Sequence, residues 1–202
     1  YEFSTHVIET LGFDGVLLQV DPFVSDNDEN FLTLIRQVRQ SIGEDALLAI
    51  TIPPDWTPID VDIPTPSIIG PGMVWDVRYK KRVALQQIDQ MIVRVYDSSL
   101  TTNDGFSAND YIEWVAHQVQ IYVEAIMSVE TDTRLLIAVS TTDNIENVHD
   151  VQVENIPAAM IGVRQGLANA GEESSVAMQG IAIYADWTTS EVEWTQFEDN
   201  WL

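Results

Sequence analysis

Two acidic side chains stand directly after apolar runs of the sequence. Asp21 follows the run that begins at Gly15, and Asp97 follows the run Met91–Tyr96. Short, nearly continuous apolar runs are typical of parallel strands that are buried on both faces. Because the carboxyl ends of such strands line ligand sites in α/β folds, we expect both carboxylates near a site, where they can act as general acids or bases. Alternatively, Asp21 caps a helix or a turn, and Asp97 bonds neighbouring loops.

Two further side chains near these strand ends are candidates for holding a ligand. Arg94 lies inside an apolar run, and a buried guanidinium needs a charged partner, for which Asp21 and Asp97 are the candidates. A carboxylate that is held ionised in this way is a poor general acid. Trp56 lies in a proline-rich connection over residues 53–75, where its ring either stacks on a ligand or packs inside the loop.

The sequence gives little support to a metal or nucleotide site. His149 is close to Asp150 and Glu154, but one histidine with scattered acids is a weak metal pattern, and a loop or helix-start histidine explains it more simply. The sequence contains no Cys, no Gly-x-Gly-x-x-Gly and no Walker motif. We therefore expect no metal centre and no cofactor.

The composition excludes several classes of partner. Against 32 acidic residues stand only 9 Lys and Arg, which gives a formal net charge of −23 at pH 7. Such a chain repels phosphates, so we exclude nucleic acid as a partner. No apolar run reaches the length of about 18 residues that indicates a membrane span, and residues 1–13 show no signal peptide. Salt screens repulsion between acids, so we expect a halophilic or marine source, or a calcium-rich cell surface.

Strand and helix patterns alternate along the chain. The expected strands are short apolar runs bounded by polar, Gly or Pro residues, and the expected helices carry apolar side chains at helical spacing. The expected strands are Gly15–Asp21, Ala46–Ile52, Met91–Tyr96, Arg134–Ser140 and Met178–Ala185. The expected helices are Glu29–Ile42, Val77–Asp89, Asn109–Ser128, Val153–Ala170 and Ser190–Leu202.

This alternation predicts an α/β fold of parallel β/α repeats. The length and the 46% hydrophobic content predict that residues 1–202 form a single domain. We predict the C-terminal part of a (β/α)8 barrel, with an open doubly wound sheet as the alternative. A complete barrel takes about 250 residues and eight strands, so the barrel requires that its first three units come from a missing segment or from another chain.

The first expected strand resembles a motif of family 18 glycoside hydrolases and their chitinase-like relatives. The family writes its fourth-strand motif as Asp-Gly-x-Asp-x-Asp-x-Glu. Asp14-Gly15 matches the start of this motif, and Asp21 falls at the position of the catalytic Glu. Leu17 and Gln19 occupy the two intervening acid positions.

Later strands carry further parts of the resemblance. Tyr96-Asp97 matches the end of the sixth-strand motif Met-x-Tyr-Asp, with Arg94 in place of the Met. Arg134–Ser140 resembles the seventh strand of the family. Trp187 stands where the end of the eighth strand carries an aromatic side chain that floors the sugar site. The resemblance therefore covers the chain as the back five-eighths of a barrel.

The resemblance implies a sugar-binding cleft at the carboxyl ends of the strands. Enzymes of the family use a Glu as general acid and the substrate's own acetamide as nucleophile. The side chain of Asp21 is shorter by one methylene, roughly 1.5 Å, and misplacement by about 1 Å can cost a hundredfold in rate. Gln19 carries no charge at the orienting position, although it can hydrogen-bond. If Asp21 and Asp97 act as a pair, a separation of about 5 Å favours retention and about 6.5–9.5 Å favours inversion.

Two functions therefore compete. The first is a glycoside hydrolase-like protein that binds an oligo- or polysaccharide in a cleft and hydrolyses β-linked polysaccharide. The second is a catalytically inactive carbohydrate-binding or structural cell-surface protein, which the loss of the family's Asp-x-Glu pair, at Gln19 and Asp21, favours. An unrelated open-sheet enzyme is a third interpretation. Under the first two, the protein is extracellular or at the cell surface. The expected catalytic side chains are Asp21, Asp97 and Tyr96, and the expected substrate contacts are Trp187, Gln19, Arg94 and Trp56.

Overall fold

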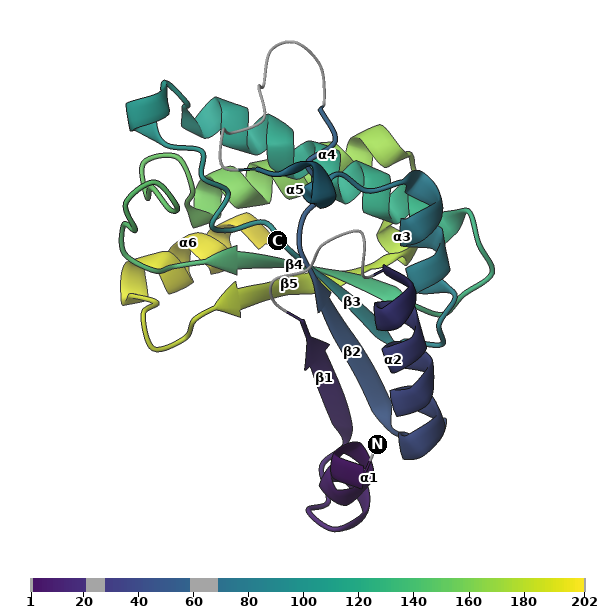
Figure 1. The fold of residues 1–202 in the computed structure, drawn as a ribbon. Helices are drawn as coiled ribbons and strands as arrows, with labels where there is room; N and C mark the ends of the chain where they lie inside the picture. Colours follow the sequence, from purple (N-terminus) through teal and green to yellow (C-terminus); the bar gives the residue numbers. More distant parts are fainter. Residues whose placement is uncertain (1, 21–27, 59–68, 202) are drawn as a thin grey trace.

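The computed structural model describes residues 2–20, 28–58 and 69–201, in which five strands alternate with helices (Figure 1). No helix in these ranges combines the length and the apolar character needed to cross a membrane. The strands are β1 Gly15–Gln19, β2 Leu47–Ile52, β3 Gln90–Arg94, β4 Arg134–Ser140 and β5 Met178–Tyr184. The α-helices are α1 Glu2–Glu9, α2 Asp28–Ile42, α3 Val77–Ala84, α4 Ala108–Met127, α5 Ile156–Ala170 and α6 Glu191–Trp201, and short 3₁₀ turns are η2 Pro71–Met73, η3 Thr102–Asp104 and η4 Ser174–Val176.

The strands form one parallel sheet in chain order, β1-β2-β3-β4-β5. Val93 of β3, for example, lies between Ile52 of β2 and Ile137 of β4. A doubly wound sheet reverses its strand order at a switch point, so the alternative prediction of that architecture is wrong. The helices pack on one another in chain order as well, from α1 on α2 to α5 on α6. The predicted α/β fold is confirmed, and the arrangement is consistent with part of a (β/α)8 barrel.

The two faces of the sheet differ in how well they are covered. Side chains alternate between the faces along each strand, and the set facing the helices is buried in the central strands β2, β3 and β4 and partly buried in the edge strands β1 and β5. The opposite, concave face carries the other set, in which Leu17 and Leu47 are about half exposed and Arg94 is partly buried. The residues facing the helices include Leu48, Ile50, Met91, Val93, Leu135 and Ile137.

Two glycines let α5 approach α4 closely. A Cβ atom at Gly166 would lie 2.5 Å from the carbonyl oxygen of Ala116, and one at Gly162 would lie 2.7 Å from the Cβ of Val115. No side chain fits at these distances. Because glycine has none, the two helices can lie against each other as Figure 1 shows. Both helices also contact β4, so their close packing fixes the layer that supports this strand.

Two helices differ from their predicted bounds by three residues or more, and one observed helix was not predicted. Helix α3 ends at Ala84 rather than Asp89, because Asp89 pairs with β2 through Leu48 and so already belongs to the entrance of β3. Helix α5 begins at Ile156 rather than Val153, because the side chain of Asn155 accepts from the N–H of Ala158 and caps the helix there. Helix α1 was not predicted.

Candidate functional site

A cavity of about 200 Å³ opens at the carboxyl ends of β2 and β3. It brings together four of the seven side chains that the sequence predicts for the site. Three of them, Arg94, Tyr96 and Asp97, come from the end of β3, and Trp56 comes from the connection after β2. The remaining lining residues are Pro53, Pro54, Ile69, Met73, Ser99 and Val148.

Asp97 is the acid of this cavity. Its backbone is in the left-handed region with φ 54°, which is uncommon for a residue with a side chain and is found at functional sites. Its side chain is 40% exposed. Burial raises the pKa of Asp97, and the nearby charge of Glu154 raises it further, while His149 and Arg94 act in the opposite direction. The carboxyl group therefore keeps its proton to a higher pH than an ordinary aspartate.

Aromatic side chains form a wall that begins at Tyr96, which lines the cavity together with Asp97, and continues through Tyr184 to Trp187 outside the cavity lining. The rings of Tyr96 and Tyr184 are stacked with their centroids 5.2 Å apart, and Trp187 meets Tyr184 edge-on at 6.0 Å. Trp187 is 78% exposed, so most of its indole surface is open to solvent. Burial raises the pKa of Tyr96 despite the opposing charge and hydrogen bond of Arg94. The wall thus combines apolar ring surface with a neutral phenol.

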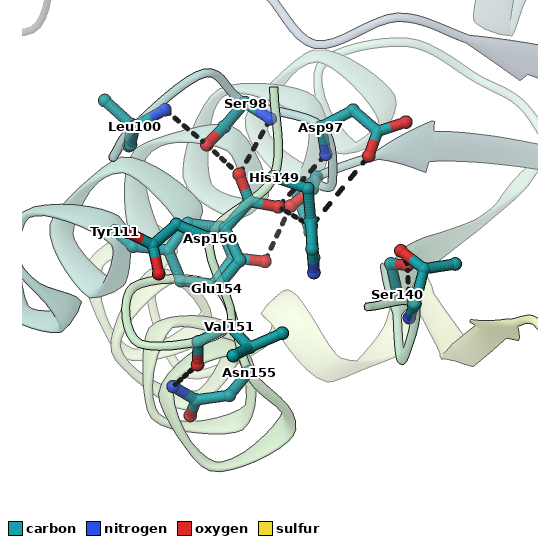
Figure 2. Close-up of polar contacts among 12 residues, drawn as sticks. Asp97, Ser98, Leu100, Tyr111, Ser140, His149, Asp150, Val151, Glu154 and Asn155 are labelled. Carbon is teal, nitrogen blue, oxygen red and sulfur yellow. Dashed lines mark hydrogen bonds and ion pairs between the residues drawn. The ribbon is translucent and has the colours of Figure 1, made fainter. Parts of the chain in front are cut away.

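A buried carboxylate anchors the turn that carries Asp97 (Figure 2). The backbone N–H groups of Asp97 and Ser98 donate to Glu154 at 3.0 Å and 2.8 Å, and the Ser98 hydroxyl donates to it as well. His149 Nδ1 donates to the same carboxylate at 2.8 Å and lies 3.8 Å from the Asp97 carboxylate. Although burial lowers the pKa of His149, the hydrogen bond and charge of Glu154 raise it above its ordinary value.

The remaining predicted residues differ in how they are placed relative to the cavity. The Trp56 side chain is only 4% exposed, and its ring stacks on Trp114 at 4.7 Å, so it lines the cavity from within the loop core. Gln19 lies at the end of β1 on the concave face, in register with Thr51 of β2. Asp21, the predicted acid, lies outside the described residues. The charge of Arg94 lowers the pKa of Asp97, against the larger raising effects of burial and of Glu154, and an ion pair between the two side chains stays a prediction.

Two pairs near the strand ends were not predicted. The sequence pattern predicts for His149 and Glu154 only a weak metal site, whereas in the structure the two side chains are joined by a hydrogen bond of 2.8 Å. Among the described residues, no group of three or more His, Cys, Asp or Glu side chains is placed to hold a metal ion. Lys80 and Asp55 form a fully buried ion pair after β2. A signal existed for the lysine, because Lys80 falls on the apolar stripe of α3 at helical spacing from Val83.

Five parallel β/α units define the class of fold, and the comparison with one solved structure agrees. No protein-family model and no curated protein matches the chain. The fold is similar to the crystal structure of the Bacillus cereus spore cortex-lytic enzyme SleL, with a TM-score of 0.56 at 10% identity. That match covers 98% of this chain and 52% of the solved one, so the chain spans about half of its length.

A second solved structure is a mandelate racemase/muconate lactonizing enzyme from a marine actinobacterium. It has a TM-score of 0.34 at 12% identity, over 89% of this chain and 42% of the other. A similarity this distant carries no argument. The first comparison, at 10% identity, establishes the likeness of fold and nothing finer.

Proposed function

We propose that the protein is a glycoside hydrolase-like protein whose cleft at the strand ends binds and hydrolyses a β-linked polysaccharide. The observation that carries the proposal is the cavity in which Asp97 lies with Tyr96 and Arg94 at the carboxyl end of β3. In folds of parallel β/α units this end of the sheet holds the active site. The likeness of fold to a spore cortex-lytic enzyme is compatible with this chemistry.

The state of Asp97 suits a reacting carboxyl group. Glycoside cleavage needs an acid that is still protonated at the working pH, so that it can protonate the leaving oxygen. Burial and the charge of Glu154 raise the pKa of Asp97, which favours the protonated form. The buried Glu154 itself is occupied by donors on both oxygens and is unsuited to this task.

The aromatic wall supports a sugar ligand. A sugar ring has apolar C–H faces, and the exposed indole of Trp187 offers a flat apolar surface beside the stacked rings of Tyr96 and Tyr184. The hydroxyl of Tyr96 adds a hydrogen-bonding group next to Asp97. We therefore assign Trp187 to substrate binding and Tyr96 to support of the transition state.

The finer assignment to family 18 is part of this proposal. It is supported by Tyr96-Asp97 at the end of β3 and by Trp187 after β5, which match the family pattern in order along the chain. Asp21 remains the predicted partner acid. We further propose an extracellular or cell-surface location, and we propose that added β/α units, from a missing segment or another chain, cover the open concave face.

The test compares wild type with Asp97→Asn and Asp21→Asn on chitin, on other β-glucan oligomers and on spore cortex. If the proposal is right, wild type releases reducing ends from one of these, and Asp97→Asn lowers kcat by about 10²–10⁴, as expected for loss of an acid. The matched control is Asp104→Asn, which removes an acid from the nearby turn η3 outside the cavity and is expected to leave turnover unchanged. Equal turnover in wild type and Asp97→Asn would remove Asp97 from the mechanism.

A non-catalytic carbohydrate-binding protein is the second candidate. Leu17 and Gln19 stand on β1 at the positions where the family pattern has acids, which favours a cleft without the family's chemistry. In that case wild type binds the same oligosaccharides without cleaving them, and Trp187→Ala weakens the binding. Tryptophan fluorescence during titration with each oligomer measures the binding, and an assay for reducing ends in the same samples separates this outcome from hydrolysis.

A further inference from the structure

The turn after β3 depends on a residue that is distant in the sequence. Glu154, in the connection before α5, accepts the N–H groups of Asp97 and Ser98, which lie 57 and 56 residues away along the chain. The Glu154 side chain is 2% exposed, so these bonds form out of contact with solvent. Hydrogen bonds to a buried charge are stronger than neutral ones, and leaving such a group unpaired is costly. The anchor therefore restricts the backbone that presents Asp97.

His149 connects this anchor to the acid in the cavity. Its Nδ1 lies 2.8 Å from Glu154 and 3.8 Å from Asp97, and its side chain is 1% exposed (Figure 2). A cation between two carboxylates stabilises the charged form of each. Glu154 meets four donors, whereas Asp97 is 40% exposed and lines the cavity. The effect of His149 on the cavity is thus exerted through Asp97.

We propose that Glu154 and His149 are a positioning pair for Asp97, in which Glu154 fixes the left-handed turn that aims the carboxyl group into the cavity and His149 controls its protonation. This inference rests on the proposed function, since it takes Asp97 as the reacting carboxyl. The pair does not touch the substrate site itself. It acts through Asp97 alone.

The titratable groups around Asp97 and His149 come from several elements. Burial and the charge of Glu154 raise the pKa of Asp97, while His149 and Arg94 lower it. Tyr111, from α4, is uncharged because burial raises its pKa well above the ordinary value of a tyrosine. Asp150 is engaged elsewhere, since it accepts two hydrogen bonds from Thr102, which lower its pKa.

Replacing His149 by Asn tests the control of protonation. The Asn side chain retains an N–H donor for Glu154 but removes the cation, so the pKa of Asp97 is expected to rise. The carboxyl ¹³C resonance of Asp97, assigned with Asp97→Asn, reports this titration in the protein without substrate. The basic limb of the pH profile of kcat/KM is expected to move upward with it. The matched control is His117→Asn, which changes a half-buried histidine on α4.

Replacing Glu154 by Gln tests the anchor. Hydrogen exchange at the amides of Asp97 and Ser98 is expected to accelerate, and kcat is expected to fall by about ten- to hundredfold with little change in KM, as for a misplaced reacting group. Glu146→Gln is the control, since Glu146 is an exposed acid in the loop between β4 and α5. If Glu154→Gln does not fold, Ser98→Ala removes one donor of the same carboxylate and is expected to cause a smaller change in the same direction.

Two results would overturn the proposal. One is an Asp97 titration in His149→Asn that equals the wild-type titration. The other is unchanged amide protection of Asp97 and Ser98 in Glu154→Gln or, if that variant fails to fold, in Ser98→Ala. Neither measurement needs a substrate. They therefore test whether Glu154 and His149 act on Asp97 even if wild type cleaves no polysaccharide and the proposed function fails. Conversely, an inactive Asp97→Asn with an unmoved titration in His149→Asn rejects the pair alone.

Discussion

Two buried ion pairs hold the loops at neighbouring strand ends, and they differ in what they touch. Asp55 and Lys80 lock the connection after β2, where Asp55 also accepts the N–H groups of Thr57 and Trp75. Glu154 and His149 lock the turn after β3 in the same manner. In both pairs a buried carboxylate collects backbone donors from a loop and pairs with a basic side chain. Lys80 comes from α3, a different element from that of Asp55, whereas His149 lies five residues before Glu154 in the same connection.

The surroundings separate the two pairs. Lys80 and Asp55 are enclosed, with the Lys80 ammonium 5.6 Å from the ring centroid of Tyr122. The second pair adjoins the half-exposed Asp97 at the cavity. Its cation is a histidine, the side chain that ordinarily changes its charge near neutral pH. The same arrangement thus serves as a fixed support in one place and as an adjustable one beside the acid.

Breaking the enclosed pair is expected to have the largest effect. Lys80→Met leaves the Asp55 carboxylate buried without its cation, and the free energy of unfolding is expected to fall by about 3–5 kcal/mol. Urea unfolding measures this change. Lys81→Met, at the partly exposed neighbouring position, is the control and is expected to stay within about 0.5 kcal/mol of wild type. Equal losses of unfolding free energy in both variants would show that the buried ion pair of Lys80 contributes no more than an ordinary surface lysine.

Breaking the second pair is expected to cost less. Glu154→Gln removes an acceptor that serves buried donors, which lowers the free energy of unfolding by about 1–3 kcal/mol. The loss is smaller because His149, left without its partner, can release its proton near neutral pH. The same urea series measures it. A loss as large as that of Lys80→Met would erase the distinction between the pairs.

The pH dependence of stability gives a sharper test of the difference between the pair that contains Lys80 and the pair that contains His149. The folded-state pKa of His149 is raised above its ordinary 6.5, so the pair contributes fully below about pH 6.5 and loses its contribution as pH rises through the folded pKa. A difference of one pKa unit between the folded and unfolded states corresponds to about 1.4 kcal/mol. Unfolding free energies measured across this window are expected to decline in wild type and to decline less in His149→Asn. If the unfolding free energies of wild type and His149→Asn decline equally over this pH range, the pH dependence does not come from His149.

The smallest effect is expected for the acid next to His149. Asp150 accepts the N–H and hydroxyl of Thr102 in an exposed setting, so Asp150→Asn is expected to change the free energy of unfolding by about 0.5 kcal/mol or less. Because its folded pKa is lowered, this contribution is present above the unfolded pKa of the aspartate and is lost as pH falls through the folded pKa. Thermal melts at about pH 3 and pH 7, on either side of the ordinary pKa of an aspartate, measure it.

The sequence predicted the strands well because burial on both faces leaves a clear apolar signal. Each of the five strands lies at the predicted place, and Asp97 lies at the end of β3, where the apolar run predicted it. Helix α3 was predicted too long, because the helical spacing of apolar residues continues past Ala84. In the structure Asp89 instead bonds to Leu48 of β2. Local spacing cannot reveal such a partner.

The site was predicted only in part for the same reason. Asp97 was predicted from its position directly after an apolar run, and Tyr96 was predicted from the resemblance to the family's sixth-strand motif. The bonds from Asp97 and Ser98 to Glu154 join residues more than 50 positions apart, and no periodicity links them. Glu154 falls inside the range predicted as helix, but the cap at Asn155 leaves it in the connection, from which it reaches across to the turn.

The strand order has a consequence for how the chain acquires its structure. Every strand after β1 pairs with the strand that precedes it in the sequence, and helices pack in the same succession. Synthesis proceeds at about 5–20 residues per second, so each strand emerges after the strand with which it pairs. Assembly can proceed vectorially from β1 to β5, and the turn at Asp97 gains its anchor only after the connection carrying Glu154 has left the ribosome.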